Sequence, residues 1–308
     1  QIPRLLADLH VDYLLLIGGN GTMFASKIIA EKAQETGLET QVIGVPKTVD
    51  NDIMSIDHTP GYASAAKYIA QATLDIGLDL WSMRTFEQVR ILEIMGRNVG
   101  WLAAAAGLAK ADNNGAPHLI YLPEVAFDED EFINDLDLIV KQQGYALVVV
   151  GEGIRDKNNN CIGNTLFSEV NSGSHTYGGA ANYLTTKVSQ VLNLRARVQD
   201  LGMAQRCFYP ARSEIDEQEA YLIGRAGVKA AVTRLGGSMV NILDITPPES
   251  VKFSAIPLVR IGGKEKQVPE KFYDKQTKQV TKEFVTWLRP LLGQWNSNYL
   301  RLDEINLV

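Results

Sequence analysis

Residues 11–45 read VDYLLLIGGNGTMFASKIIAEKAQETGLETQVIGV, and this stretch decides the fold that we predict. Residues 11–17 form a short, almost wholly apolar run, which is typical of a strand buried in a parallel sheet. A glycine-rich turn follows at residues 18–22, and apolar residues then recur at helical spacing until Gly37, a residue type that often ends a helix. Residues 41–45 form a second apolar strand. One strand–loop–helix–strand unit of this kind is the building block of a doubly wound α/β sheet.

The alternation of strands and helices continues along most of the chain. Apolar runs predict strands at residues 89–95, 118–122 and 145–150, and helical spacing predicts helices at residues 61–80, 99–110, 130–143, 178–192 and 214–234. Near the C-terminus, an apolar stripe predicts a helix packed on the body of the protein; its members are Phe284, Leu288, Leu291 and Leu292. At about 100–200 residues per domain, 308 residues correspond to two domains or one large one. The sequence therefore predicts an α/β protein with mainly parallel sheets.

The composition excludes several classes of protein. Lys and Arg number 30 against 36 Asp and Glu, and the net charge of -6 makes the chain a poor general binder of nucleic acid or of an anionic membrane. No run reaches the roughly 18 apolar residues needed to span a bilayer. The two cysteines, Cys161 and Cys207, exclude a disulfide-rich scaffold and fit a reducing compartment, so we expect a cytoplasmic protein. The chain starts at Gln1, close to its first strand, and we expect residues upstream to be missing.

Conspicuous loops follow four of the predicted strands. They are GGNGT at residues 18–22, PKTVDND at residues 46–52, MGR at residues 95–97 and GEG at residues 151–153. Ligands of open parallel sheets bind beyond the carboxyl ends of the strands, so this coincidence predicts a binding site at that edge. The turn at residues 18–22 matches neither a Walker A loop nor GxGxxG, and a tight structural turn explains it equally well.

The segment at residues 46–52 carries the clearest chemistry. Asp50 and Asp52 are two residues apart, and such a pair can supply one general base and one carboxylate linked to a metal. Lys47 can neutralise phosphate charge. The alternative is an ordinary turn rich in Asp and Asn.

The remaining polar candidates are single residues. Arg97 follows its strand directly, and its guanidinium group can bind phosphate or hydroxyl groups. Glu152 follows another strand in the same way, although one such residue is often structural. Three further arginines cluster around the segment LGMAQR, namely Arg195, Arg197 and Arg206, and we interpret Arg195 as a solvated surface residue. The four histidines lack metal-ligand spacing, CxxC and GxSxG are absent, and Cys207 is predicted to fill a small buried space.

In order and rough spacing, GGNGT, PKTVDND, MGR, PEVAF, VVVGEG and LGMAQR resemble the motifs of the phosphofructokinase family, whose members phosphorylate fructose 6-phosphate. The resemblance runs from about Leu14 to Arg206, and PKTVDND together with MGR is its most specific part. It implies two Rossmann-like three-layer α/β/α domains with the active site in the cleft between them.

The resemblance also implies the bounds of these domains. Residues 1–61 with about 205–260 correspond to the domain that binds the phosphoryl donor. The family's first strand is missing from that domain here, so its donor site is expected to be incomplete. Residues 62–204 correspond to the domain that binds fructose 6-phosphate, and residues 261–308 to a C-terminal helical extension packed on the body.

Individual residues receive roles from the same resemblance. Asp50 is similar to the general base that takes the proton from the sugar 1-hydroxyl, and Asp52 to the acidic residue near the metal and the transferring phosphoryl group. Lys47 is the third residue implied in catalysis. The residues implied in binding the donor are Gly19, Asn20, Gly21 and Thr22, and those implied in binding fructose 6-phosphate are Thr48, Met95, Gly96, Arg97, Glu152 and Arg206.

The family also suggests a cofactor and an assembly. Arg197 resembles a residue that reaches the 6-phosphate, often across a subunit interface, so we expect a homodimer or homotetramer. Mg²⁺ is expected near Asn20 and Asp52, because phosphoryl transfer depends on positioning and on charge stabilisation by cations. We expect no nucleic acid or membrane as a partner.

The chain departs from the family pattern at several positions. Asn20 stands where members usually carry an Asp that helps to hold Mg²⁺, and a neutral amide should bind the ion less well. Met203 replaces a common histidine, and Gln88 replaces an arginine of some short members.

Two residues indicate different phosphoryl donors. Lys47 matches the lysine of pyrophosphate-dependent members, where ATP-dependent bacterial members usually have Gly. Gly21 is ATP-like, because many pyrophosphate users carry there an Asp that sterically disfavours ATP. We predict pyrophosphate, since a lysine directed at phosphate acts on the chemistry whereas a glycine only leaves space. The alternatives are an ATP-dependent 6-phosphofructokinase and a non-catalytic sensor of sugar phosphates. A dinucleotide-binding dehydrogenase is a further alternative, and the absence of GxGxxG argues against it.

Overall fold

The computed structural model describes residues 1–308 except 111–114, 164–166, 169–174, 177–178, 245–251 and 297–308. The chain forms two compact units. The first unit comprises Gln1–Ala65 and Arg212–Gln267, and the second comprises Ala66–Ala211 and Val268–Val308.

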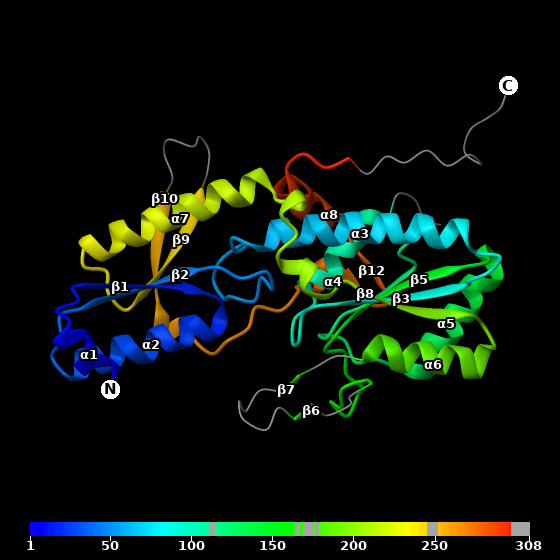
Figure 1. The fold of residues 1–308 in the computed structure, drawn as a ribbon, viewed down its shortest axis with the longest axis horizontal. Helices are drawn as coiled ribbons and strands as arrows, with labels where there is room; N and C mark the ends of the chain where they lie inside the picture. Colours follow the sequence, from blue (N-terminus) through cyan, green and yellow to red (C-terminus); the bar gives the residue numbers. More distant parts are fainter. Residues whose placement is uncertain (111–114, 164–166, 169–174, 177–178, 245–251, 297–308) are drawn as a thin grey trace. The chain divides into compact units, whose positions relative to one another are not determined.

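The first unit is built around a four-stranded sheet in the order β1-β2-β9-β10. Its strands are β1 (Tyr13–Gly18), β2 (Gln41–Pro46), β9 (Ser238–Asp244) and β10 (Lys252–Pro257). Neighbouring strands are parallel except for β9 and β10, which are antiparallel. The helices are α1 (Ile2–Asp8), α2 (Asn20–Glu35) and α7 (Glu214–Val232). Since α2 and α7 pack on opposite faces of the sheet, the unit has three layers (Figure 1).

The alternation of side chains along β2 divides the core of the first unit. Ile43 and Val45 point to the face that α7 covers, where they pack with Ile223. Val42 points to the other face and packs with Ile29 of α2. Burial on both faces explains why this parallel strand is apolar throughout.

The second unit contains a wholly parallel sheet in the order β4-β5-β3-β8. Its strands are β3 (Val89–Ile94), β4 (Leu119–Tyr121), β5 (Ala146–Gly151) and β8 (Ala196–Asp200). The helices are α3 (Tyr62–Ser82), which begins in the first unit, α4 (Trp101–Ala105), α5 (Glu129–Gln143) and α6 (Ala180–Leu192). α5 and α6 cover one face of the sheet and α3 the other (Figure 1). Both units therefore confirm the predicted α/β class.

Short elements complete the second unit. They are the antiparallel pair β6 (Phe167–Ser168) and β7 (His175–Thr176), the hairpin of β11 (Tyr273–Asp274) and β12 (Gln279–Val280), and the helix α8 (Lys282–Leu288). From the tail, Phe284, Leu288 and Leu292 are buried, and the Trp287 ring lies 5.3 Å from the ring of Trp101. Within the predicted extension, the residues up to Gln267 belong to the first unit and those from Val268 to the second.

The structure also contains elements that the sequence did not predict. α1, β8, β9 and β10 are additional, and only the first half of the helix predicted at residues 99–110 is an α-helix, since a 3₁₀ turn follows at Ala106–Ala109. β8 was missed because its apolar residues, Ala196 and Val198, alternate with Arg197 and Gln199, so the strand lacks a continuous apolar run. Among the described residues, no helix is both long and apolar enough to cross a membrane.

Candidate active site

Two of the predicted loops adjoin in the first unit, at the carboxyl ends of β1 and β2. Gly18 and Pro46, the last residues of these strands, are partners in the sheet register. The amide of Lys47 donates to the carbonyl oxygen of Gly18 at 2.9 Å. A Cβ added to Gly19 would lie 3.3 Å from the Cβ of Thr48, so the backbone of the glycine turn lies directly against the Thr48 side chain. The predicted donor-binding residues therefore contact the predicted catalytic segment.

The glycine turn leads into α2 and leaves space around it. Gly19 is the N-cap of this 16-residue helix and provides no side chain to cap it. The first amide groups of such a helix can bind an anion. Apart from the backbone of α2 and the adjoining residues, no atom of the described residues lies within 4 Å of a Cβ added to Gly21, so there is open space at this position.

The segment after β2 is held by hydrogen bonds on both sides of Thr48. The Thr48 hydroxyl accepts from the amide of Asp50 at 3.1 Å, and the Thr48 carbonyl accepts from the hydroxyl of Thr59 at 3.0 Å. The Thr48 amide donates to the carbonyl of Pro60 at 3.1 Å. Asn51 adopts a φ of 55°, a left-handed conformation that turns the chain between Asp50 and Asp52. Lys47 is exposed at the start of this segment.

Asp52 lies in an environment that disfavours its charge. Burial raises the pKa of Asp52 to about 6, and the negative charge of Asp50 acts in the same direction. The Asp52 Oδ1 atom is buried and has no hydrogen-bond partner among the described residues. The same holds for the side-chain oxygen of Asn20 at the start of α2.

Two carboxylates of α7 brace the far end of the segment. Asp216 accepts from the amide of Gly61 at 2.7 Å and from both the amide and the hydroxyl of Ser64. Glu219, one turn later, accepts from His58 Nε2 at 2.7 Å, and Asp57 lies at the other ring nitrogen. Burial acts to lower the pKa of His58, but the hydrogen bonds to Asp57 and Glu219 outweigh it and raise the pKa to about 9.

The other two predicted loops, MGR and GEG, adjoin the LGMAQR segment in the second unit. The amide of Met95 donates to Gln205 Oε1 at 2.9 Å, and the amide of Gly96 donates to Glu152 Oε1 at 3.3 Å. A Cβ on Gly153 would lie only 1.7 Å from the carbonyl oxygen of Arg97, so the two backbones touch and no other residue fits there. These contacts place MGR, GEG and LGMAQR together at the carboxyl ends of β3, β5 and β8.

The comparisons with known proteins agree with this geometry. A family model described as phosphofructokinase matches residues 1–231.

The chain belongs to the phosphofructokinase family.

This result confirms the family that the sequence motifs predicted. A sulfofructose kinase from Alkalicoccus urumqiensis is 38% identical over 295 residues, which are 95% of this chain and 74% of that protein. A pyrophosphate–fructose 6-phosphate 1-phosphotransferase from Rhodospirillum rubrum is 34% identical over 99% of this chain and 76% of its own length. The crystal structure of a pyrophosphate-dependent phosphofructokinase from Nitrosospira multiformis matches with a TM-score of 0.82 and 29% identity, covering all of this chain and 74% of that one.

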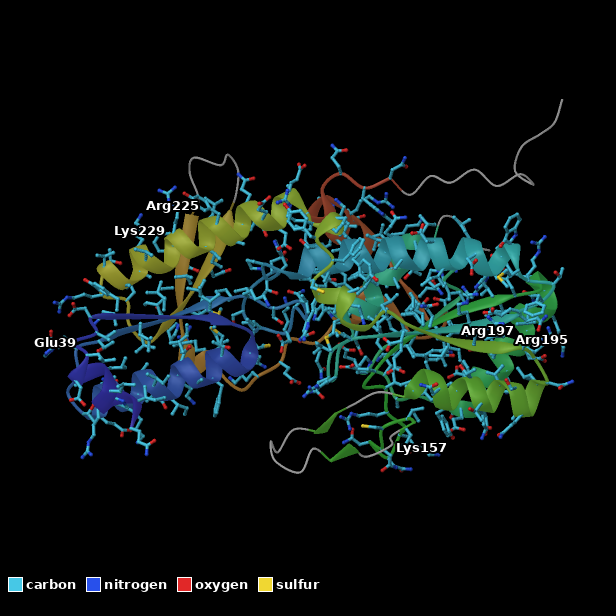
Figure 2. The ribbon with its side chains drawn as sticks, viewed as in Figure 1. Glu39, Lys157, Arg195, Arg197, Arg225 and Lys229 are labelled. Atoms are coloured by element: carbon cyan, nitrogen blue, oxygen red, sulfur yellow. The ribbon has the colours of Figure 1, made fainter. Side chains whose placement is uncertain are left out.

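The arginines of this phosphofructokinase-family chain lie in different places within the second unit. Arg97 and Arg206 are exposed beside the converging loops. Arg197 is set apart from them, because its register partner in β3 is Arg90, near the start of that strand. Its Nε lies 3.4 Å from Glu87, and the guanidinium groups of Arg195 and Arg197 both lie over the Phe86 ring. Arg195 and Arg197 are labelled close together in Figure 2.

Phosphofructokinase-family enzymes generally use Mg²⁺, and the first unit offers oxygen atoms that suit this ion. The buried oxygens of Asn20 and Asp52 lack hydrogen-bond partners among the described residues, and Mg²⁺ prefers oxygen ligands. No group of three or more His, Cys, Asp or Glu in the described part of the chain is arranged to hold a metal. Either oxygen suits Mg²⁺, which usually takes one or two protein ligands and completes its shell with water and substrate phosphates.

Sequence reasoning missed four residues that shape these loops. They are Gln205, Asp216, Glu219 and Lys266. Of these, Lys266 contacts Asn51 and Asp52. Gln205 lies inside the LGMAQR motif, so the motif could have identified it as a residue of the site. The other three act on residues more than 150 positions away in the chain, and no local pattern marks them. Cys207 was predicted to be buried, but it is exposed and its thiol donates to the carbonyl of Met203 at 3.1 Å.

Proposed function

We propose that this protein transfers a phosphoryl group from pyrophosphate to the 1-hydroxyl of fructose 6-phosphate, giving fructose 1,6-bisphosphate and phosphate in a reversible reaction of glycolysis. The relative from R. rubrum carries the name of this activity and aligns with 99% of the chain. The observation that carries the proposal is the contact between the glycine turn and the segment Lys47–Asp52 at one end of a parallel sheet.

The first unit supplies the groups that act on the transferring phosphoryl group. Asp50 is the general base that accepts the proton of the 1-hydroxyl. The hydrogen bond from its backbone amide to the Thr48 hydroxyl fixes the backbone that carries this carboxylate. Lys47 neutralises charge on the departing phosphate. Asp52 and, more weakly, Asn20 would hold Mg²⁺, which would supply further neutralisation of phosphate charge.

The second unit, together with Thr48, supplies the residues that bind the sugar phosphate. Arg97 and Arg206 bind the phosphorylated sugar through charge-assisted hydrogen bonds, and Glu152 with the backbone of Met95 and Gly96 orients its hydroxyl groups. Arg197 is exposed and set apart from these residues, which supports a role in the site of a second subunit. We therefore propose a homodimer or homotetramer. We also propose a cytoplasmic location, where charged sugar phosphates are retained.

Pyrophosphate is the donor that the loop geometry favours. Lys47 is exposed next to the glycine turn, where its ammonium group can reach phosphate oxygens. The open space at Gly21 leaves room for a nucleotide, so ATP is the competing donor. The donor identity rests on Lys47, because a positive charge contributes to the chemistry and open space does not.

A second candidate substrate is sulfofructose. The relative named sulfofructose kinase is 38% identical to this chain, a higher identity than that of the R. rubrum relative. A sulfonate carries one negative charge, whereas a phosphate monoester carries about -1.5 to -2 at pH 7. Arg97 and Arg206 are two exposed arginines beside the loops proposed to bind the sugar, and two positive charges suit the more highly charged phosphate. We therefore rank fructose 6-phosphate first.

Initial rates with Mg²⁺ in four pairings test the proposal: pyrophosphate or ATP with fructose 6-phosphate or sulfofructose. We expect kcat/KM for pyrophosphate with fructose 6-phosphate to exceed the other three values by at least about tenfold. A preference for ATP would overturn the donor, and a preference for sulfofructose would overturn the acceptor. Binding of fructose 6-phosphate by calorimetry without turnover in any pairing would identify a non-catalytic sensor.

A further inference from the structure

A short segment from the end of the first unit lies against the loop that carries Asp50 and Asp52. Glu265 forms an antiparallel bridge with Ile53. The amide of Lys266 donates to the carbonyl of Asp52 at 2.8 Å. The main chain of this segment therefore pairs with the loop directly after the two carboxylates.

The side chain of Lys266 reaches further into the same loop. Its Nζ atom lies 3.0 Å from the Asn51 side-chain oxygen, 3.1 Å from the carbonyl of Ile56 and 2.7 Å from the carbonyl of Asp57. An ammonium group has three protons to donate, and these three acceptors match them. One residue thus bonds to the loop at four points, through its amide at Asp52 and through Nζ at the other three.

Lys266 is partly buried, and its ammonium group is only partly accessible to water. Burial lowers the pKa of Lys266 to about 8, although the charges of Asp57 and Asp52 oppose the shift. The oxygen atoms of Asn51, Ile56 and Asp57 replace water molecules as hydrogen-bond acceptors for the ammonium group. Losing the ammonium would leave the oxygens of Asn51 and Ile56, two buried residues, without this donor, which is costly for a loop that must keep one shape.

We propose that Lys266 is a positioning residue that fixes the loop at residues 51–57 and thereby sets the placement of Asp50 and Asp52. This inference rests on the proposed function of those two carboxylates. Asn51, which accepts from Lys266, lies between them and has a φ of 55°, so a change in its backbone would redirect both neighbours. Lys266 lies beyond residues 1–231, the part that the phosphofructokinase model matches.

The test compares Lys266→Met with Lys264→Met. Met keeps the apolar stem of the lysine and removes its donors, and Lys264 is an exposed lysine on the same segment. We expect Lys266→Met to lower kcat about 10- to 100-fold, since small misplacements of catalytic groups have effects of that order. KM for fructose 6-phosphate should change less than about threefold, because most of its proposed contacts lie in the second unit. Lys264→Met should behave as wild type.

Hydrogen–deuterium exchange gives a readout that does not depend on activity. Peptides covering residues 48–58 should exchange faster in Lys266→Met than in wild type, whereas the peptides of β3 and β5 should be unchanged. Lys266→Arg, which keeps a cation and several donors, should recover a substantial part of both kcat and loop protection. Wild-type kcat and wild-type exchange in Lys266→Met would overturn the positioning role.

Asn51→Gly tests the same contact from the loop. Glycine readily adopts the positive φ, and the substitution removes the buried side chain together with its acceptor, so this variant serves if Lys266→Met does not fold. We expect a smaller loss of kcat, of about 3- to 10-fold, with faster exchange of the loop. An unchanged kcat and unchanged exchange there would contradict the inference. A wild type without turnover would overturn the proposed function instead, and the exchange experiment would still decide whether Lys266 fixes the loop.

Discussion

Asp50 and Asp52 have different surroundings although one residue separates them. Asp52 has a buried oxygen without a partner among the described residues and a pKa raised to about 6, first by burial and then by the charge of Asp50. Asp50 is anchored through its amide to the Thr48 hydroxyl. A carboxylate whose charge is disfavoured gains from a bound cation, so these surroundings support a metal-linked role for Asp52 and leave Asp50 as the base.

Replacing Asp50 by Asn tests this division of roles. The amide cannot accept the 1-hydroxyl proton, so kcat should fall by about 10²- to 10⁴-fold. KM for fructose 6-phosphate should stay close to that of wild type in the same rate measurements. Asp12→Asn, which alters an exposed carboxyl in the same unit, is the matched control. Turnover like that of wild type in Asp50→Asn would remove the residue from the catalytic set.

Lys47 is the residue on which the choice of donor depends. With pyrophosphate the whole donor is charge, and no nucleoside contributes binding energy. Lys47→Gly should therefore lower kcat/KM for pyrophosphate by on the order of 10²- to 10³-fold, as expected for the loss of one charge contact in the transition state. Measured in parallel, kcat/KM for ATP should fall less or rise, because Gly21 leaves open space. Equal losses with both donors would contradict the assignment.

Among the helices and strands, α7 holds the end of the segment that is proposed to be catalytic. Asp216 and Glu219 lie one turn apart on this helix, and they bind Gly61, Ser64 and His58. The helix thus fixes the chain that leaves the loop, while Lys266 fixes the loop itself. A helix that packs on the sheet is a rigid support for residues that must keep their geometry.

The contact between His58 and Glu219 should make stability depend on pH. The folded pKa of about 9 lies above the ordinary value of 6.5, so the contribution to stability is complete below about pH 6.5 and is lost as the pH rises through 9. His58→Asn should reduce the free energy of unfolding by on the order of 1–3 kcal/mol at pH 6.5 and by less at pH 9.5. Urea unfolding of both proteins at both pH values measures this difference, and His10→Asn is the exposed control. An equal loss at both pH values would rule out a charged His58.

Local patterns in the sequence were enough to predict most elements and loops of the site. β2 and β5 were recognised because strands buried on both faces are apolar throughout, and their loops follow them in the chain. β8 was not recognised, because Arg and Gln alternate with its apolar residues and this partly exposed strand therefore has no continuous apolar run. The supports of the site could not be predicted, since Lys266 and Asn51 are 215 positions apart and only the folded chain brings them together.

At the scale of the whole molecule, the two units carry different parts of the proposed reaction. The first holds the residues proposed for phosphoryl transfer, and the second holds most of those proposed to bind the sugar phosphate. Substitutions in the two units should therefore affect different kinetic constants. The contrast between kcat and KM tests this division without reference to how the units are arranged.

Arg97→Ala is the counterpart of Asp50→Asn in the second unit. Losing a charge-assisted hydrogen bond worth roughly 1.5–3 kcal/mol should raise KM for fructose 6-phosphate by at least about tenfold. The kcat at saturation should fall much less than in Asp50→Asn. Arg195→Ala is the control, because this exposed arginine lies over Phe86, away from the loop of Arg97. An unchanged KM in Arg97→Ala would remove that residue from the sugar-phosphate site.

The order of strands along the chain determines when each sheet can be completed during synthesis. All four strands of the second unit's main sheet lie between Val89 and Asp200, so they leave the ribosome before the last two strands of the first unit. β2 must wait for β9, its neighbour, which begins only at Ser238. Lys266 emerges later still. A nascent chain therefore exposes one edge of β2 while the other sheet is already complete, and the loop with the two carboxylates lacks the contacts of Lys266 until that residue has emerged as well.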